Sequence, residues 1–252
     1  MKESLRLNRY LAMSGVASRR RCDELIRQGR VAVNGARVEE LGSRVVPGDD
    51  DVTVDGAGVV LPQSVHTLAM NKPPGVLVAA SDTRGRRTVM DLLEEFRERV
   101  FPVGRLDLRS EGLLLFTSDG DLAYRLAHPR FKVEKLYRVQ VAGRVSPAAI
   151  ESLRRGVELE DGRTQPAGVK VLEKARGGAT LEIELREGRK RQIRRMLAVF
   201  GHDVVRLQRV RFGPIEIGEL AEGHWRELSP AEIGRLRTAV GLPEDADEGE
   251  SS

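Results

Sequence analysis

Two short apolar patterns with the spacing of helices begin the chain. The first consists of Leu7, Tyr10 and Leu11. The second consists of Cys22, Leu25 and Ile26. Ser14-Gly15 interrupts the first pattern, Ser18 stands at the N-cap position of the second, and Gly29 follows its end. The sequence therefore predicts two helices before residue 30.

A hairpin and a further strand are expected after these helices. Asn34-Gly35, between VAV and ARV, is the turn signal of a tight β-hairpin. The run VTV at residues 52–54 predicts another strand. We expect this module to span residues 1–55. Residues 56–66 contain glycine and proline without clear periodicity, and we expect them to form a linker.

Beyond residue 66, short runs of β-like composition predominate. Strands are predicted at residues 66–70, 113–118, 136–141, 179–185 and 202–207. Helical spacing predicts one helix from Thr88, with Asp91 completing a capping box, and another from Ser146-Pro147. Asp119-Gly120 and Gly177-Gly178 have the composition of turns. Because strands and helices do not alternate strictly, we expect an α+β fold with a mixed, mainly antiparallel sheet flanked by helices.

One more helix is predicted just before residue 201. Its apolar face consists of Ile193, Met196, Leu197 and Phe200. Gly201 ends the pattern, and Gln192, Arg194 and Arg195 are expected on the other faces of this helix. We expect the second domain to span residues 67–240. Residues 241–252, which end in PEDADEGESS, are expected to form a disordered acidic tail.

Composition limits the class of protein. The chain has 252 residues, of which 40% are hydrophobic and 32% charged, and this predicts a globular protein with one large core or two smaller ones. No apolar run approaches the roughly 18 residues of a membrane span, and the first residues lack the apolar stretch of a signal peptide. Cys22 is the only cysteine, which excludes an internal disulfide and a cysteine-based zinc site. We therefore expect a cytoplasmic protein without membrane contact.

Basic residues are concentrated in two parts of the chain, although the net charge is only +4. Residues 1–48 contain ten Lys and Arg against five Asp and Glu, and residues 186–211 contain nine against two. The tail at residues 241–252 contains five acidic residues and no basic one. The rest of the chain is therefore more basic than the total suggests, and a polyanion such as nucleic acid is the natural partner.

The strongest candidate for chemistry is a polar cluster directly before an apolar strand. Arg105 and Asp107 come first, and Arg109 and Glu111 follow them. A carboxylate between arginines, on a loop backed by a strand, suits a nucleophile that must be ionised, oriented and partly desolvated. From these residues alone, a structural Asp–Arg salt bridge is the better-supported interpretation.

The N-terminal module resembles a known RNA-binding domain. The stretch LNRYLAMSGVASRRRCDELIRQGRVAVNGARV is similar to the S4-like RNA-binding domain, most clearly at ASRR and at GRVAVNG. The resemblance implies that Arg19, Arg20 and Arg27 contact RNA, and the apolar stripe of their helix leaves them pointing outward. Such arginines position phosphates and do not read the base sequence.

The polar cluster resembles a catalytic motif. GRLD followed by EGLLL is similar to the motif of the RsuA/RluB group of pseudouridine synthases, which act on ribosomal RNA. The resemblance implies that Asp107 is the catalytic carboxylate. It also implies that Arg105 fills the space left by the target base, which must be flipped out of its stack to react.

Three further segments agree with this resemblance. NKPPG at residues 71–75 resembles a turn that begins the catalytic domain, and we expect its role to be structural. Tyr137 matches the family's active-site tyrosine, which lies against the uracil and helps to remove its C5 proton. Arg194 matches the basic residue that pairs with the catalytic aspartate. Further RNA contacts are expected from Arg189, Lys190, Arg191 and Gln192, and phosphate contacts also from Arg206 and Arg209.

The implied reaction is an isomerisation that needs no cofactor. The bond from ribose C1′ to uracil N1 breaks, the uracil rotates, and C1′ joins C5. Three roles for Asp107 stay open: attack on the sugar, attack on the base, and removal of a ribose proton. The sequence contains no GxxxxGK[ST] loop, and its four histidines have no metal-ligand spacing, so we expect neither cofactor nor metal.

Two other classes of protein compete with the enzyme. One is a non-catalytic RNA-binding factor of ribosome assembly, and the other is a glycosidase-like hydrolase with Glu111 as the second carboxylate. The presence of Asp107, Tyr137 and Arg194 argues against the first class, and the basic surfaces argue against the second. The stretch RLQRVRFGPIEIGELAEGHWREL resembles family members acting on large-subunit (23S) ribosomal RNA more than the small-subunit (16S) enzyme. We expect a monomer whose partner is ribosomal RNA or a pre-ribosomal particle.

Overall fold

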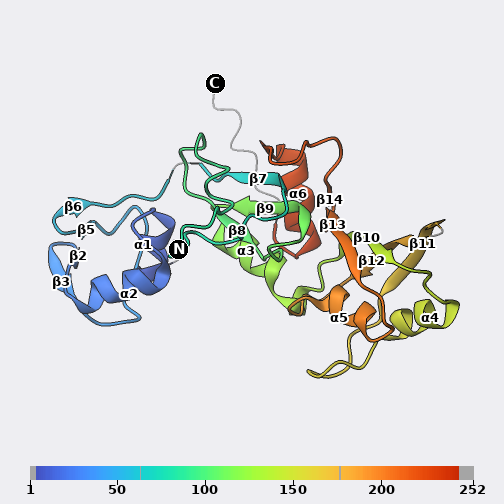
Figure 1. Ribbon diagram of the computed structural model, residues 1–252. Helices are drawn as coiled ribbons and strands as arrows, with labels where there is room; N and C mark the ends of the chain where they lie inside the picture. Colours follow the sequence, from blue (N-terminus) through green and yellow to red (C-terminus); the bar gives the residue numbers. More distant parts are fainter. Residues whose placement is uncertain (1–3, 63, 176, 244–252) are drawn as a thin grey trace. The chain divides into compact units, whose positions relative to one another are not determined.

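The structure is a computed structural model, which describes residues 4–62, 64–175 and 177–243 (Figure 1). The chain divides into two compact units, Met1–Val65 and His66–Ser252. Within the described ranges, no helix has the length and apolar character needed to cross a bilayer. Most of the expected acidic tail, from residue 244 onward, lies outside the described residues.

The first unit contains the two predicted helices. Helix α1 spans Leu7–Met13 and helix α2 spans Arg19–Arg27. Ser18 caps α2 as predicted, since its Oγ accepts a hydrogen bond from the backbone N–H of Arg21 (3.3 Å). Gly29 follows α2 with a φ of +62°, a conformation that favours glycine. The predicted apolar faces of both helices form the core of this unit.

Strands complete the first unit. Strands β2 (Val31–Val33) and β3 (Ala36–Val38) form the predicted hairpin, with positive φ at both turn residues between them. Strand β5 (Val52–Val54) pairs with β2, and β1 (Leu5–Arg6) pairs with β4 (Arg44–Val45). The expected linker is wrong in its first residues, because β6 (Ala57–Gly58) pairs with β5 and extends the sheet.

The second unit is built on a mixed sheet, as the α+β prediction requires. Nine strands of the described residues follow the order β11-β12-β10-β13-β9-β7-β15, with β14 beside β13 and β8 beside β9. Their bounds are β7 Thr67–Lys72, β8 Phe101–Val103, β9 Glu111–Thr117, β10 Lys135–Ala142, β11 Gly168–Ala175, β12 Gly178–Leu185, β13 Val204–Phe212, β14 Ile215–Glu216 and β15 Trp225–Glu227. Among these strands only β9 and β13 pair in parallel.

Strand β9 is buried on both faces, which explains its continuous apolar sequence. Leu113 and Leu115 pack into one core, whereas Leu114 and Phe116 pack into another on the opposite face. Helices α3 (Gly120–Ala127) and α6 (Pro230–Ala239) contribute to the first of these cores. Helices α4 (Pro147–Arg155) and α5 (Gln192–Ala198) pack against β10, β11 and β12 in a third core (Figure 1).

Helix α3 was not predicted. Asp119-Gly120 had the composition of a turn, but Asp119 is the N-cap of α3 and its carboxylate accepts hydrogen bonds from the backbone N–H groups of Asp121 (2.8 Å) and Leu122 (3.0 Å). Aspartate and glycine are typical both of turns and of helix starts, so the two residues alone do not separate these outcomes. After α3 comes a single 3-10 turn, η1 (Pro129–Phe131).

The predicted helix from Thr88 is also wrong. Residues 88–96 form successive turns in which the N–H groups of Asp91, Leu93 and Phe96 bond to carbonyls three residues earlier. Half of the predicted capping box exists, because the Asp91 carboxylate accepts from the Thr88 N–H (2.7 Å). The start of the segment is bound elsewhere, since the Val89 N–H donates to the Leu77 carbonyl (2.8 Å). A long-range backbone bond therefore prevails over the local helical pattern.

The parallel contact between β9 and β13 requires a glycine. Gly112 has a φ of +100°, and a Cβ built on it would lie 2.3 Å from the carbonyl oxygen of Arg209. This distance is far shorter than any tolerated contact, so the backbones can approach only because the side chain is absent. Since β13 joins the half of the sheet containing β10 to the half containing β9, this close approach connects the two halves.

We predict that Gly112→Ala destabilises the protein by about 3 kcal/mol or more, because the new methyl group meets rigid backbone and the positive φ disfavours alanine. Urea unfolding followed by circular dichroism measures the change. The matched control is Gly120→Ala, at the first position of α3, where a Cβ meets open space. The control should unfold at the wild-type urea concentration or slightly above it. Equal midpoints for the two variants would contradict the steric argument.

Candidate active site

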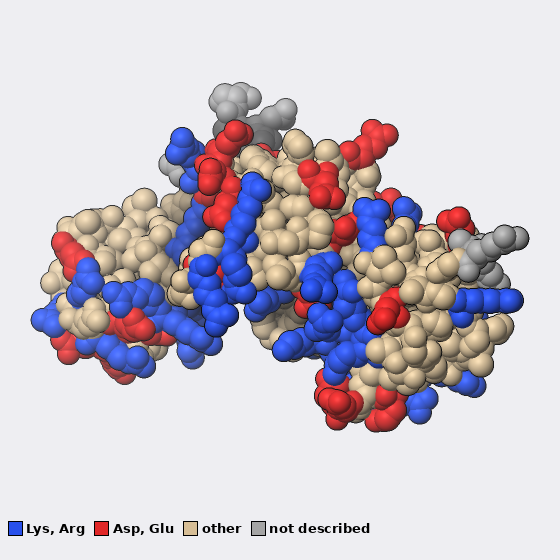
Figure 2. Space-filling view, in the orientation of Figure 1, with Lys and Arg blue, Asp and Glu red and all other residues tan. Residues whose placement is uncertain are grey.

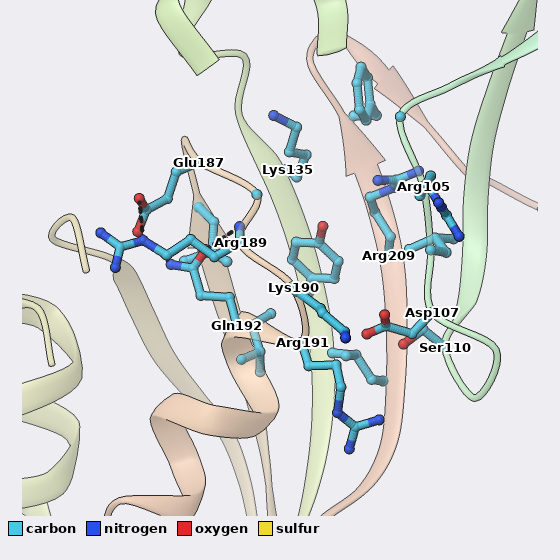
Figure 3. A pocket seen from close by; sticks show the side chains of 18 of the residues that line it. Arg105, Asp107, Ser110, Lys135, Glu187, Arg189, Lys190, Arg191, Gln192 and Arg209 are labelled. Atoms are coloured by element: carbon cyan, nitrogen blue, oxygen red, sulfur yellow. Dashed lines mark hydrogen bonds and ion pairs between the residues drawn. The ribbon is translucent and has the colours of Figure 1, made fainter. Parts of the chain in front are cut away.

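A pocket of about 730 Å³ lies at the junction of the two halves of the sheet in the second unit. Three parts of the chain supply most of its lining: the loop from Gly104 to Ser110, the strands β10 and β13, and residues 185–193 before and within α5. Figure 3 shows Arg105, Asp107, Ser110 and Arg209 on one side and Glu187, Arg189 and Gln192 on the other. The pocket therefore brings together Arg105, Asp107, Tyr137 and the 189–192 segment, which are far apart in the sequence.

The loop that carries Asp107 is held by backbone hydrogen bonds. The Ser110 N–H donates to the Asp107 carbonyl (3.0 Å), which closes a turn around the aspartate. The Gly75 N–H donates to the Leu108 carbonyl (2.7 Å) and ties the loop to the NKPPG segment. The Asp107 side chain is half-buried and faces the pocket. Its position is thus fixed by the backbone, whereas its carboxylate stays accessible to a ligand.

A buried lysine is hydrogen-bonded to the end of this loop. Lys72 is 0% exposed, and its Nζ donates to the carbonyls of Pro73 and Ser110 (both 2.8 Å). Burial lowers the pKa of Lys72 to about 8. Three carboxylates oppose this shift: Glu111, Asp107 and Glu222. The sequence interpretation gave the NKPPG segment a structural role but missed this cation beside Asp107.

Arg194 differs from its expected arrangement. The resemblance implied a direct pair with Asp107, but the guanidinium donates to the carbonyls of Val204 (2.8 Å) and Arg109 (3.3 Å). Within the described part of the chain, no ion pair joins Arg194 to Asp107, and Arg194 is not among the residues that line the pocket. Burial lowers the pKa of Arg194, while the nearby Asp107 charge raises it. Arg194 is therefore within electrostatic reach of Asp107, held in place by two backbone carbonyls.

Tyr137 lies on β10 in the wall of the same pocket as Asp107. The predicted strand face is confirmed, since Val139 and Val141 are buried on the same side. Tyr137 is half-buried and packs against two of the hydrophobic cores. Its ring can therefore form a flat wall for an aromatic ligand while its body remains part of the protein interior.

The 186–192 segment is more structured than the sequence suggested. Gln192, expected on an outer face of its helix, is only 4% exposed, and its Nε2 donates to Glu187 Oε1 (2.6 Å). Arg189 donates to Glu187 Oε2 (3.2 Å, dashed in Figure 3) and to the Gly162 carbonyl (2.6 Å). Both residues line the pocket, but their polar groups are already engaged. Lys190 and Arg191 are exposed at the same rim.

Two arginines on β13 that were expected to contact phosphates have partners within the protein. Arg206 forms an ion pair with Glu111 (2.6 Å). Arg209 is only 2% exposed, and its Nε donates to the Leu113 carbonyl (2.7 Å). Glu111 does not line the pocket, so the hydrolase with Asp107 and Glu111 as paired carboxylates loses its geometric basis. Among the described residues, no group of three or more His, Cys, Asp or Glu side chains could hold a metal ion.

Exposed basic side chains are found in both units. In the first, Arg19, Arg20 and Arg27 lie on the exposed side of α2, as predicted. In the second, Figure 2 shows Lys and Arg side chains gathered over the region of α5, where Lys190 and Arg191 are exposed. Surfaces of this sign attract the phosphates of nucleic acids over distances of about a Debye length.

Comparison with protein families matches the two units separately. The model described as RNA pseudouridylate synthase matches residues 66–199, and the S4 domain model matches residues 5–51. A solved pseudouridylate synthase superposes with a TM-score of 0.67 at 28% sequence identity, covering 92% of this chain and 99% of that protein. The mixed sheet with flanking helices is therefore that of a pseudouridine synthase.

Relatives similar over nearly the whole chain carry related names. An uncharacterised RNA pseudouridine synthase of Aquifex aeolicus is 44% identical, covering 94% of this chain and 96% of the relative. Ribosomal large subunit pseudouridine synthase B of Bacillus subtilis is 41% identical, covering 92% and 95%. The protein of the same name from Escherichia coli O157:H7 is 42% identical, covering 95% and 85%.

The buried Lys72 makes stability depend on pH. An unfolded lysine keeps its proton until pH about 10, but folded Lys72 releases it at about 8. Between these values the unfolded state binds more protons, so the free energy of unfolding rises with pH. We predict that the wild type gains about 3 kcal/mol between pH 8 and 10.5 relative to Lys72→Met.

Urea unfolding of both proteins across this pH range measures the difference. The carbonyls of Pro73 and Ser110 lose their partner in the variant, but that loss is the same at every pH and shifts the whole curve without changing its slope. Parallel curves for the two proteins would show that Lys72 titrates as an ordinary lysine.

Proposed function

Because the chain belongs to the RNA pseudouridylate synthase family, we propose that it isomerises a uridine of large-subunit ribosomal RNA with Asp107 as the catalytic carboxylate. The observation that carries this proposal is the placement of Asp107 and Tyr137 in the wall of one pocket with a basic rim. The S4 and synthase domains together make the protein RNA-binding.

Asp107 suits this reaction because its carboxylate is accessible while its backbone is fixed. The reaction breaks the N1–C1′ bond, rotates the uracil and joins C5 to C1′, with loss of the C5 proton. Attack on the sugar, attack on the base and removal of a ribose proton each require the ionised carboxylate. All three are therefore compatible with the same site.

Two cations lie near the Asp107 carboxylate. Lys72 and Arg194 are both within electrostatic reach of Asp107, and both are held by backbone carbonyls. A positive charge fixed by the backbone stabilises a neighbouring negative charge without reorganisation during the reaction. We propose that Arg194 acts on Asp107 through its charge, in place of the direct pair that the resemblance implied.

Tyr137 and Arg105 are proposed to act on the nucleotide itself. Stacking of the flipped uracil on the Tyr137 ring would place C5 near the phenol oxygen, which suits removal of the C5 proton. Arg105 is exposed at the pocket and can enter the space that the base vacates. Both roles agree with the expectation from the sequence.

RNA binding outside the pocket is proposed for two groups of side chains. Arg19, Arg20 and Arg27 on α2 suit contacts to backbone phosphates, and so do Lys190 and Arg191 at the pocket rim. Arg189 and Gln192 are proposed to act indirectly, by shaping the rim through Glu187. We assign RNA binding to residues 1–58, which now include β6, and catalysis to residues 67–240.

Large-subunit ribosomal RNA is the proposed substrate because two relatives, about 40% identical over nearly the whole chain, bear that substrate in their names. The small-subunit RNA is the alternative substrate. A non-catalytic assembly factor is disfavoured, because such a factor has no need to keep Asp107 and Tyr137 in one pocket. We further propose that the protein works as a monomer in the cytoplasm, where its substrate RNA would be found.

We predict that Asp107→Asn abolishes isomerisation, with a loss of at least about 1,000-fold, because an amide cannot supply a negative charge. Ribosomal RNA carrying tritium at uridine C5 provides the assay, since the label leaves when C1′ joins C5. RNA affinity should change less than about threefold, because Asn has nearly the same shape and the basic surfaces are intact. Wild-type rates of tritium release in the variant would remove Asp107 from its proposed role.

A further prediction concerns the substrate. Unmodified large-subunit and small-subunit RNA are incubated separately with the protein, marked chemically at pseudouridine and read by primer extension. We expect one new site in the large-subunit RNA and none in the small-subunit RNA, with Asp107→Asn as the blank. A site in the small-subunit RNA alone would assign the protein to the alternative substrate and leave its isomerase activity intact.

A further inference from the structure

Two cations in the wall of the pocket approach the same aromatic ring and lie close enough to repel each other. Lys135 begins β10 and Arg209 lies on β13, and both approach the ring of Phe212. The Lys135 Nζ is 5.4 Å and the Arg209 Cζ 4.9 Å from the ring centroid. All three residues line the pocket. The aromatic ring offers each cation a weak attraction, but it cannot neutralise either charge.

The bonding of Arg209 is incomplete. Its Nε donates to the Leu113 carbonyl (2.7 Å), but its buried Nη2 has no hydrogen-bond partner among the described residues. Arg209 is only 2% exposed, so water cannot surround this group freely. A buried donor without a partner is unfavourable, and more so when it is charged. Because Arg209 lines the pocket, a ligand that enters it can supply the missing acceptor.

Lys135 lacks compensation as well. Burial and the neighbouring Arg209 together lower the pKa of Lys135 to about 8. In the described chain, no hydrogen bond or ion pair to a carboxylate is found for its ammonium group. Two like charges in a half-buried wall repel each other and are poorly solvated. An anion that contacts both cations reduces their repulsion and supplies charge-assisted hydrogen bonds.

The charge of the whole pocket favours an anion at this position. Six basic side chains line the pocket: Arg105, Lys135, Arg189, Lys190, Arg191 and Arg209. Among the described residues, two acidic side chains line it, Asp107 and Glu187. Glu187 is already bonded to Arg189 and Gln192, and Asp107 belongs to the proposed chemistry. The uracil base is neutral, so the charged part of the substrate is the phosphodiester backbone.

We propose that Lys135 and Arg209 together bind one backbone phosphate of the RNA, at or next to the nucleotide that enters the pocket. This inference rests on the proposed function and names two binding residues for the same site. Lys135 and Tyr137 are two residues apart on β10, so their side chains share a face, and Arg209 is the direct Cα partner of Tyr137 across β10 and β13. A phosphate held there fixes the nucleotide against Tyr137.

The test pairs a change in the protein with a change in the RNA. The probe is a set of hairpins from large-subunit ribosomal RNA that the protein binds, in which a single linkage at a time is a neutral methylphosphonate. For the wild type, neutralising one particular linkage should weaken binding about tenfold, the effect of losing a charge-assisted contact. Lys135→Met should bind the natural hairpin about tenfold more weakly, and neutralising that linkage should change its affinity less than twofold.

Two further variants complete the design. Arg209→Gln keeps an amide donor for the Leu113 carbonyl and removes the charge, so it should show the same insensitivity even if Lys135→Met folds poorly. Lys170→Met makes the same chemical change at an exposed position of β11 outside the pocket, and it should retain the wild-type tenfold effect. Thermal unfolding of each variant verifies that it is folded.

The proposal is overturned if neutralising each linkage weakens RNA binding by Lys135→Met and by Arg209→Gln as much as it weakens binding by the wild type. This binding test does not require turnover, so tritium release from the natural hairpin tests the proposed function separately. Isomerisation without the coupled linkage would remove the phosphate site and leave the enzyme. If one linkage is coupled to Lys135 and Arg209 but no isomerisation is observed, the phosphate site stands and the proposed enzyme activity does not.

Discussion

The close approach of Gly112 to Arg209 is the constraint on which the site depends. It allows β9 to run parallel to β13 for two residue pairs, and this contact joins the two halves of the sheet. The loop carrying Asp107 ends where β9 begins, and Tyr137 lies on β10, the other neighbour of β13. The absence of one side chain therefore brings the carboxylate and the tyrosine to a common pocket.

Fixed cations in the pocket wall and near Asp107 give the site its electrostatic character. Lys72, Arg194 and Arg209 each donate to backbone carbonyls, so their charges are held by the fold and not by opposite charges. In a partly desolvated site such charges act more strongly on a ligand than they would in water. The cost is borne by the folded state, because each cation has lost part of its hydration. The folded protein is therefore less stable than it would be without these buried charges, but its site is already arranged for an anionic substrate.

Local patterns predicted the elements that local interactions determine. The cap at Ser18, the hairpin at Asn34-Gly35 and the apolar face of α5 all follow from neighbouring residues. The helix from Thr88 was wrong because a distant carbonyl binds the Val89 N–H. The buried positions of Gln192 and Arg209 could not be read from periodicity, since polar and charged residues are ordinarily assigned to the surface.

Motif resemblance identified the reacting groups but not how they are supported. Asp107 and Tyr137 line one pocket, as the motifs implied. Lys72 is a cation near Asp107, and it lies in a segment that was expected to be only a structural turn. Its signal was present in the sequence: a lysine that ends a strand, TLAMNK, in which every residue is buried. A charged residue that continues an apolar strand must find polar partners inside the protein, and the loop of the catalytic aspartate supplies one of them. Burial of charge is therefore the feature that connects the fold of this protein to its chemistry.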